Sequence, residues 1–333
     1  HHRGGQEVNR GPTSHGGYSA LLGDSPAMHA LHTQLRRLEA APDTTILLVG
    51  ESGTGKELAA RAIHESSARR GHPIVTVDCT GVTGPLALSQ LFGHEAGAFT
   101  GARSRHLGLI DAAGMGTLFL DEVGELDPAT QSALLRVLDS QTYRLVGSTD
   151  VIRTGVRIIA ATNRDLPAAI EAGLFREDLY HRLNVLSVTL PPLRERAGDV
   201  RLLASSFLQR FDSRGGTRRP RELADDALAA LESWRWPGNV RELRNAIERA
   251  VVVAPGPRIC LSDLPPAIRP DRPGRPRIGP FDLSAAEERL VRAAMDEANG
   301  NQTEAARLLG LSRPALRRRL RKLGLLTPEK GRR

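Results

Sequence analysis

The chain has 333 residues, of which 40% are hydrophobic and 25% charged, and this predicts a globular protein of two or three folding units. No apolar run approaches the roughly 20 residues that a membrane span needs, so we expect no membrane partner. The net charge of +8 lies entirely in residues 301–333, where ten basic residues face two acidic ones, and it predicts a polyanionic partner for this tail.

The chain up to residue 190 predicts an α/β fold. Residues 1–17 are rich in Gly and His without periodicity and predict a disordered segment or linker. From 18 to 190, short apolar runs alternate with helical stretches, which is typical of a parallel sheet wrapped in helices. The predicted strands span 45–49, 74–77, 117–120, 156–160 and 185–190.

The rest of the chain predicts helices only. After two prolines, residues 191–262 form a predicted all-α lid, and the Pro- and Arg-rich stretch 263–280 predicts an extended linker. Residues 281–333 predict a separate small helical domain. The two cysteines, Cys79 and Cys260, stand apart without metal-ligand spacing, which favours a reducing cytoplasm.

A glycine-rich heptapeptide follows the first predicted strand and opens a helix. Its residues are Gly50, Glu51, Ser52, Gly53, Thr54, Gly55 and Lys56. Glycines let backbone N–H groups close on phosphate oxygens, the helix N-terminus adds positive potential, and Lys56 would reach the β- and γ-phosphates. We interpret the heptapeptide as an ATP site, with a glycine-rich turn as the alternative.

Two acidic residues, Asp121 and Glu122, follow the third predicted strand, at the edge where parallel sheets place their ligands. There Asp121 would hold Mg²⁺, and Glu122 would polarise the attacking water. An exposed acidic turn is the alternative.

A loop of small residues lies between these two motifs, and it consists of Gly97, Ala98, Phe99, Thr100, Gly101 and Ala102. It lacks the bulk for a core, so it predicts a mobile tip that presents an aromatic ring and a hydroxyl to a partner. With this loop between those motifs, the chain resembles the sigma-54-dependent transcriptional activators, AAA+ ATPases that carry GAFTGA. The resemblance covers about residues 21–326.

The resemblance implies roles for further residues. Asn163 would be a sensor near the γ-phosphate, and Arg241 would be the sensor of the lid. Arg176 and Arg182 would project into a neighbouring subunit as arginine fingers. A cytoplasmic, ATP- and Mg²⁺-dependent ATPase is implied, which binds upstream DNA as dimers and assembles into a hexameric ring. Its loop 97–102 would contact sigma-54 and remodel the closed complex of its RNA polymerase.

Two positions are unusual beside this pattern. Glu57 stands where other phosphate loops place a Ser or Thr on Mg²⁺, but sigma-54 activators share this Glu, and we count it among the ATP-binding residues. Asp78 replaces the Asn with which the family holds its catalytic Glu. An Asp there would repel Glu122 or share a proton with it.

The tail resembles a Fis-type helix-turn-helix, whose second helix enters the major groove of duplex DNA. Leucines repeat at i, i+4 and i+7 from Leu316, and this leaves a basic face for DNA that comprises Arg313, Arg317, Arg318, Arg321 and Lys322. A merely solvated basic helix is the alternative. Before it, an apolar face that includes Leu290 and Val291 suits dimerisation or a core.

Two other functions stay open at this point. One is a DNA-binding repressor that uses ATP only to switch its oligomeric state. The other is an AAA+ remodeller of another protein client.

Overall fold

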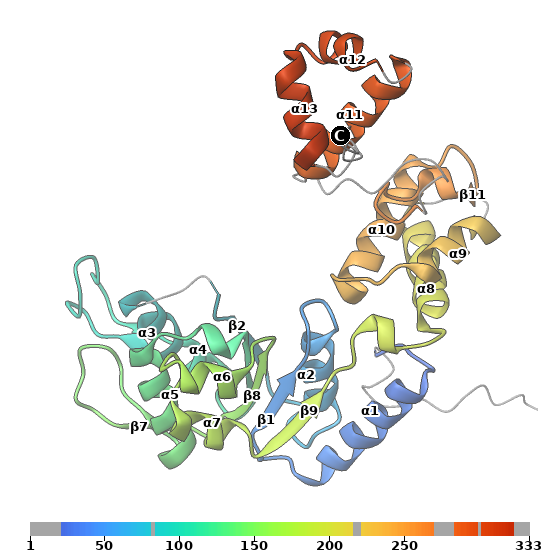
Figure 1. The fold of residues 1–333 in the computed structure, drawn as a ribbon. Coiled ribbons are helices and arrows are strands. Elements are labelled where there is room, and N and C mark those ends of the chain that lie inside the picture. The colour runs from blue at the N-terminus through green and yellow to red at the C-terminus, as the bar shows by residue number, and fades with distance from the viewer. Residues whose placement is uncertain (1–20, 81–83, 216–220, 270–282, 299–300, 323–333) are drawn as a thin grey trace, which may run out of the picture. The chain divides into compact units, whose positions relative to one another are not determined.

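The computed structural model describes residues 21–80, 84–215, 221–269, 283–298 and 301–322. The predicted disordered segment 1–17, most of the predicted linker and the last residues of the tail lie outside the described residues. The chain divides into two compact units, one up to Arg269 and one from Pro270 (Figure 1).

A five-stranded parallel sheet forms the centre of the larger unit (Figure 1). In spatial order its strands are β2 (Ile74–Asp78), β5 (Thr117–Asp121), β8 (Arg157–Thr162), β1 (Ile46–Val49) and β9 (Leu186–Thr189). All five strands were predicted, and the α/β class is confirmed. The carboxyl ends of neighbouring strands lie level, with Val49 beside Thr162 and Asp78 beside Asp121.

Helices cover both faces of the sheet, because successive strand residues point to opposite sides. Leu48 packs on the side of α1 (Pro26–Arg37) and α2 (Lys56–Glu65). Leu120 packs on the other side. The helices there are α3 (Pro85–Phe92), α4 (Leu109–Ala113), α5 (Pro128–Ser140), α6 (Leu166–Glu171) and α7 (Glu177–Leu183). Burial of both faces explains why the strands read as continuous apolar runs.

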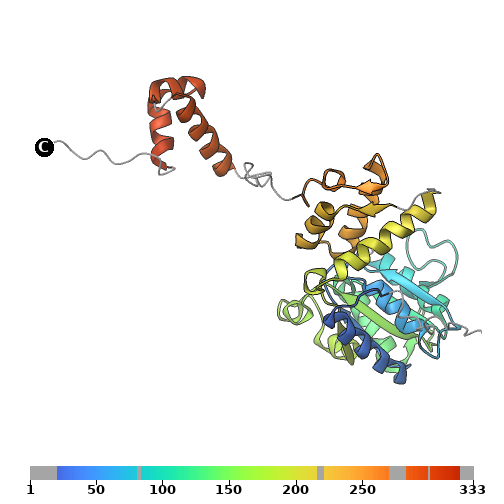
Figure 2. The ribbon, with the colours of Figure 1, turned by 90° about the vertical axis from the view of Figure 1, so that its right-hand side faces the viewer.

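The lid is built from α8 (Asp199–Gly215), α9 (Asp225–Ser233) and α10 (Asn239–Val253) (Figure 2). Its core surrounds Trp236, which is fully buried. A short parallel ladder between β10 (Glu222–Leu223) and β11 (Arg258–Ile259) adds strand structure to a lid that was predicted as all-helical.

The lid also extends further along the chain than predicted. The predicted linker begins at 263, yet Leu264 and Ile268 are buried in the lid core. These two apolar side chains attach the start of this stretch to the lid, although its prolines and arginines are typical of an extended linker.

Two short antiparallel ladders project from the sheet and support loops. One joins β3 (Gly93–His94) to β4 (His106–Leu107), and the other joins β6 (Thr142–Tyr143) to β7 (Ile152–Arg153). Strands of two residues carry too little periodicity to be predicted from sequence.

The described residues of the smaller unit form three helices, α11 (Leu283–Glu297), α12 (Gln302–Leu308) and α13 (Arg313–Lys322). Val291 and Ala294 pack with Leu316 and Leu320 in its core. The predicted apolar face therefore serves the core, except that Leu290 is 63% exposed. Within the described part of the chain, every helix is too short or too polar to span a bilayer.

Candidate functional site

The phosphate loop, residues 50–56, joins the end of β1 to the start of α2. Gly53 and Gly55 have φ angles of +80° and +105°, a region that favours glycine. A Cβ on Gly53 would also lie 2.4 Å from the carbonyl oxygen of Gly238 in the lid. The Thr54 hydroxyl closes the loop by donating to the carbonyl of Glu51 at 2.8 Å. Backbone shape and lid packing thus both require glycine at position 53.

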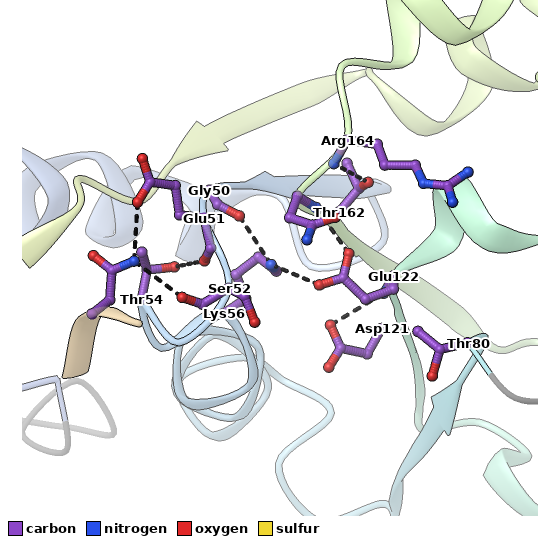
Figure 3. A network of polar contacts seen from close by, with 12 residues as sticks. Gly50, Glu51, Ser52, Thr54, Lys56, Thr80, Asp121, Glu122, Thr162 and Arg164 are labelled. Carbon is purple, nitrogen blue, oxygen red and sulfur yellow. Dashed lines mark hydrogen bonds and ion pairs between the residues drawn. The ribbon is translucent and has the colours of Figure 1, made fainter. Parts of the chain in front are cut away.

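Lys56 connects the phosphate loop to the acidic strand end. Its side chain is 6% exposed, and its Nζ donates to the carbonyl of Gly50 at 2.9 Å and to Glu122 Oε1 at 3.0 Å (Figure 3). The ion pair compensates a nearly buried ammonium group, which would otherwise be costly. Two residues that were predicted from separate motifs therefore meet at one point.

Glu122 is held by both of its carboxylate oxygens. Oε1 accepts from Lys56, and Oε2 accepts from the backbone N–H of Asn163 at 2.9 Å. The φ angle of Glu122 is +54°, a conformation that costs a non-glycine residue about 1–3 kcal/mol and is common at functional sites. The structure thus brings the predicted base and the predicted sensor together, through the backbone of the sensor.

Asp121 lies directly beside Glu122, and its Oδ1 accepts from the Glu122 N–H at 3.1 Å. Burial, followed by the charge of Glu122, raises the pKa of the Asp121 carboxyl. A bound cation would relieve both effects. Among the described residues, no group of three or more His, Cys, Asp or Glu side chains is placed to enclose a metal ion. This donor set fits Mg²⁺, which usually takes one or two carboxylates and completes its shell with phosphate and water.

The lid contacts the phosphate loop through three side chains, two of which sequence reasoning did not find. The Arg194 guanidinium donates to both oxygens of Glu51 at 2.9 and 2.6 Å, and this lowers the pKa of Glu51 to about 2. The Asn239 amide donates to Glu51 at 3.1 Å and to the Ser52 carbonyl at 3.0 Å. Arg241, the predicted lid sensor, donates to the Ser52 hydroxyl at 2.8 Å. Three side chains, from the lid and from the segment that leads into it, therefore contact the same short loop.

Two further residues that the sequence singled out lie apart from the Lys56–Glu122 group. Glu57 is 51% exposed and pairs with Arg61 one turn along α2 at 2.9 Å, so its carboxylate does not join the Lys56–Glu122 group. Asp78 neither contacts Glu122 nor shares a proton with it. Its carboxylate instead accepts hydrogen bonds from Thr80, which lower its pKa and keep it ionised.

The two predicted arginine fingers lie exposed on α7 and the residue before it. Arg176 pairs with Asp178 at 2.6 Å, and Arg182 pairs with Asp139 at 2.6 Å. Both guanidinium groups are about half exposed or more, with 46% and 61% of their side chains accessible. Exposed ion pairs of this kind cost little to exchange for a stronger partner.

The loop 97–102 is held at its base and open at its tip. Glu95 N–H donates to the Val146 carbonyl at 3.0 Å, and Val146 N–H donates to the Gly93 carbonyl at 2.9 Å. The Phe99 ring packs edge-on against His94 with centroids 4.9 Å apart, whereas Thr100 is exposed. The loop that follows β6 therefore braces the base.

The second and third helices of the smaller unit are joined by a tight turn at Gly310, whose φ angle is +63°. Arg313, Arg317 and Arg318 of α13 are exposed, opposite the buried Leu316 and Leu320. The side chains of Arg321 and Lys322 lie outside the described residues.

Comparison with known proteins assigns each part of the chain. Residues 21–189 match the family described as "Sigma-54 interaction domain", residues 194–278 match "AAA+ ATPase lid domain", and residues 283–323 match "Bacterial regulatory protein, Fis family". The chain therefore belongs to the sigma-54-dependent transcriptional activators. It combines an AAA+ ATPase with a Fis-type DNA-binding helix-turn-helix.

Individual relatives agree with this assignment. The regulatory protein AtoC of Escherichia coli K12 is 43% identical over 92% of this chain and 68% of its own length. The transcriptional regulatory protein ZraR of the same strain is 47% identical over 89% of this chain and 67% of its own length. The crystal structure of NtrX from Brucella abortus in complex with ATP has a TM-score of 0.69 at 35% identity, and covers 91% of this chain and 69% of NtrX.

Proposed function

We propose that this protein hydrolyses ATP in a ring of subunits to drive the loop 97–102 against sigma-54. The stroke would convert the closed complex of sigma-54 RNA polymerase into the open complex. The observation that carries this proposal is the construction of the loop, which is braced at its base by Val146 and exposed at Thr100. A braced base with a free tip suits a part that transmits motion to a partner.

The chemistry would be divided among residues that the structure brings together. Lys56 and the N–H groups of the phosphate loop would bind the phosphates, and Asp121 would hold Mg²⁺. The ion, when bound, would neutralise charge on the phosphates. Glu122 would orient the attacking water and accept its proton, while Asn163 and Arg241 would report the presence of the γ-phosphate.

Neighbouring subunits would complete each site. Arg176 and Arg182 would leave their ion pairs with Asp178 and Asp139 and stabilise the charge that develops on the transferred phosphoryl group of the next subunit. This requirement supports assembly from dimers to a hexameric ring.

The smaller unit would bind upstream duplex DNA as a dimer. The exposed arginines of α13 support binding in the major groove, and the exposed Leu290 of α11 supports a contact between two copies. Because polymerase and DNA are the proposed partners, the proposed location is the cytoplasm. A repressor that uses ATP only as a switch, or a remodeller of another client, would not need this loop beside intact Lys56 and Glu122.

A test of remodelling separates these functions. Phe99→Ala should reduce open complexes, detected by chemical reactivity of unpaired thymines with sigma-54 polymerase, by at least about tenfold, because an interface anchor is lost. ATP turnover should stay within about twofold. Val151→Ala, which removes an exposed apolar side chain from the neighbouring loop, is the control. Normal open complexes with Phe99→Ala would contradict the role of the loop, and none with the intact protein would favour a rival function.

DNA binding is tested on the full chain. Arg317→Ala, in the first half of α13, should relax sequence preference, because base contacts are expected there. Lys322→Ala should weaken binding to all sequences alike and reduce the salt slope by about one unit. Unchanged site preference with Arg317→Ala would refute the proposed register of the recognition helix.

A further inference from the structure

Asp78 places a third carboxylate beside the two acidic residues of the site. It ends β2, in register with Asp121 at the end of β5, and Glu122 follows directly. Strands of one sheet lie about 4.8 Å apart, so carboxylates on neighbouring strand ends repel one another unless something separates them.

Thr80 provides this separation. Its hydroxyl donates to Asp78 Oδ1 at 2.6 Å, and its backbone N–H donates to the same oxygen at 2.9 Å. Both donors belong to the residue two positions further along the chain, and they hold the carboxylate toward that residue. Figure 3 shows Thr80 on the side of Asp121 and Glu122 away from Lys56.

The partners of Glu122 are thereby left undisturbed. Its two oxygens are taken by Lys56 Nζ at 3.0 Å and Asn163 N at 2.9 Å, and its left-handed backbone depends on such contacts to persist. A second carboxylate that turned toward Lys56 would compete for the only ammonium group that pairs with Glu122 in the described structure.

We propose that Thr80 is a positioning residue for ATP hydrolysis, which holds the Asp78 carboxylate away from Glu122 and Lys56. The proposal rests on the role given above to Glu122. In this role Thr80 acts only through Asp78, to which its hydroxyl and its backbone N–H donate. Its removal therefore matters only as long as position 78 carries a charge.

A double-mutant cycle tests this dependence in the full chain. Thr80→Val keeps the shape of the side chain and removes the hydroxyl donor. It should lower kcat about threefold, with the KM for ATP within about twofold, because contacting residues couple by such factors. Thr80→Ser keeps the donor and should retain the original kcat. In an Asp78→Asn background, Thr80→Val should have no further effect.

Two controls separate positioning from loss of structure. Thr130→Val removes the same kind of hydroxyl-to-carboxylate bond, here 2.7 Å to Asp127 at the start of α5, and should leave kcat unchanged. Raising the salt concentration should shrink the effect of Thr80→Val, since Asp78 and Thr80 are exposed and their charge effects are screened. An equal loss of kcat in the Asp78→Asn background would overturn the proposal, and so would an unchanged kcat in Thr80→Val.

Failure of the proposed base would be seen separately. Glu122→Gln should abolish turnover while ATP still binds. If that variant keeps its turnover, the role of Glu122 fails. If it loses turnover and the cycle shows no coupling, only the inference on Thr80 fails.

Discussion

The phosphate loop and the loop 97–102 are both rich in glycine, but their glycines serve different purposes. At Gly53 a Cβ would collide with the lid, 2.4 Å from the carbonyl oxygen of Gly238. Gly97 and Gly101 have φ angles of +83° and +106°, yet among the described residues nothing lies within 4 Å of a Cβ on either. The first loop needs glycine for space and conformation, whereas the second needs it for conformation alone.

The phosphate loop is proposed to need one more residue, an arginine from the next subunit. We expect Arg176→Ala to lower ATP turnover about a thousandfold, because the proposed arginine finger from the next subunit would be lost. Nucleotide binding should remain. The specific activity of the unaltered protein should rise with protein concentration as subunits assemble.

Mixing variants provides the control for this prediction. Arg176→Ala and Glu122→Gln subunits should regain part of the turnover together, because each supplies what the other lacks. Arg61→Ala removes an exposed arginine on α2 and should change little. A specific activity that stays constant down to concentrations where only monomers exist would refute action across subunits.

The difference between the two glycine-rich loops is tested at Gly53. Gly53→Ala should weaken ATP binding by about tenfold, because the added methyl group pushes the lid off the loop in addition to the strained backbone. Titration calorimetry with ATP and Mg²⁺ measures this. Binding that stays at the original strength would show that the lid yields easily.

Gly101→Ala tests the loop 97–102 in the same way. It should leave ATP binding unchanged, because no neighbour is displaced, and lower the stability by about 1–2 kcal/mol through its left-handed backbone. Chemical denaturation of the full chain measures the second effect. A loss of ATP affinity similar to that of Gly53→Ala would show that the two loops do not differ as described.

The smallest effect concerns the ion pair that ties the lid to the phosphate loop. The pKa of Glu51 is lowered from 4.5 to about 2, so its pairing with Arg194 contributes fully above about pH 4.5 and is lost as the pH falls through 2. Glu51→Gln should therefore be slightly less stable at pH 7, by less than about 1 kcal/mol because the pair is exposed. Denaturation at pH 7 and pH 3 should show this difference shrinking, and a constant difference would assign it to the Asn239 contact.

The sequence predicted the buried parts of the fold well, because burial leaves a local signal. Each of the five strands is a short, mostly apolar run, and the phosphate loop, the acidic pair and Asn163 each lie at the end of one. The ion pair between Glu51 and Arg194 joins residues 143 positions apart on the surface, where no periodicity marks a partner. The two-residue ladders at β3 and β6 carry too little periodicity to be predicted. The buried lid residues Leu264 and Ile268 were missed because they stand in a stretch whose prolines and arginines are typical of a linker.

The strand order has a mechanical consequence. The lid follows β9 at one edge of the sheet, the phosphate loop follows β1 next to it, and the chain reaches α3 and the loop 97–102 from β2 at the opposite edge. Three strand spacings, about 14 Å, separate β1 from β2. If the loop 97–102 moves in response to ATP, as proposed, the movement has to pass from β1 through β8 and β5 to β2, and thus past the acidic ends of β5 and β2. The sheet therefore separates the phosphate loop from the loop 97–102 and also connects them.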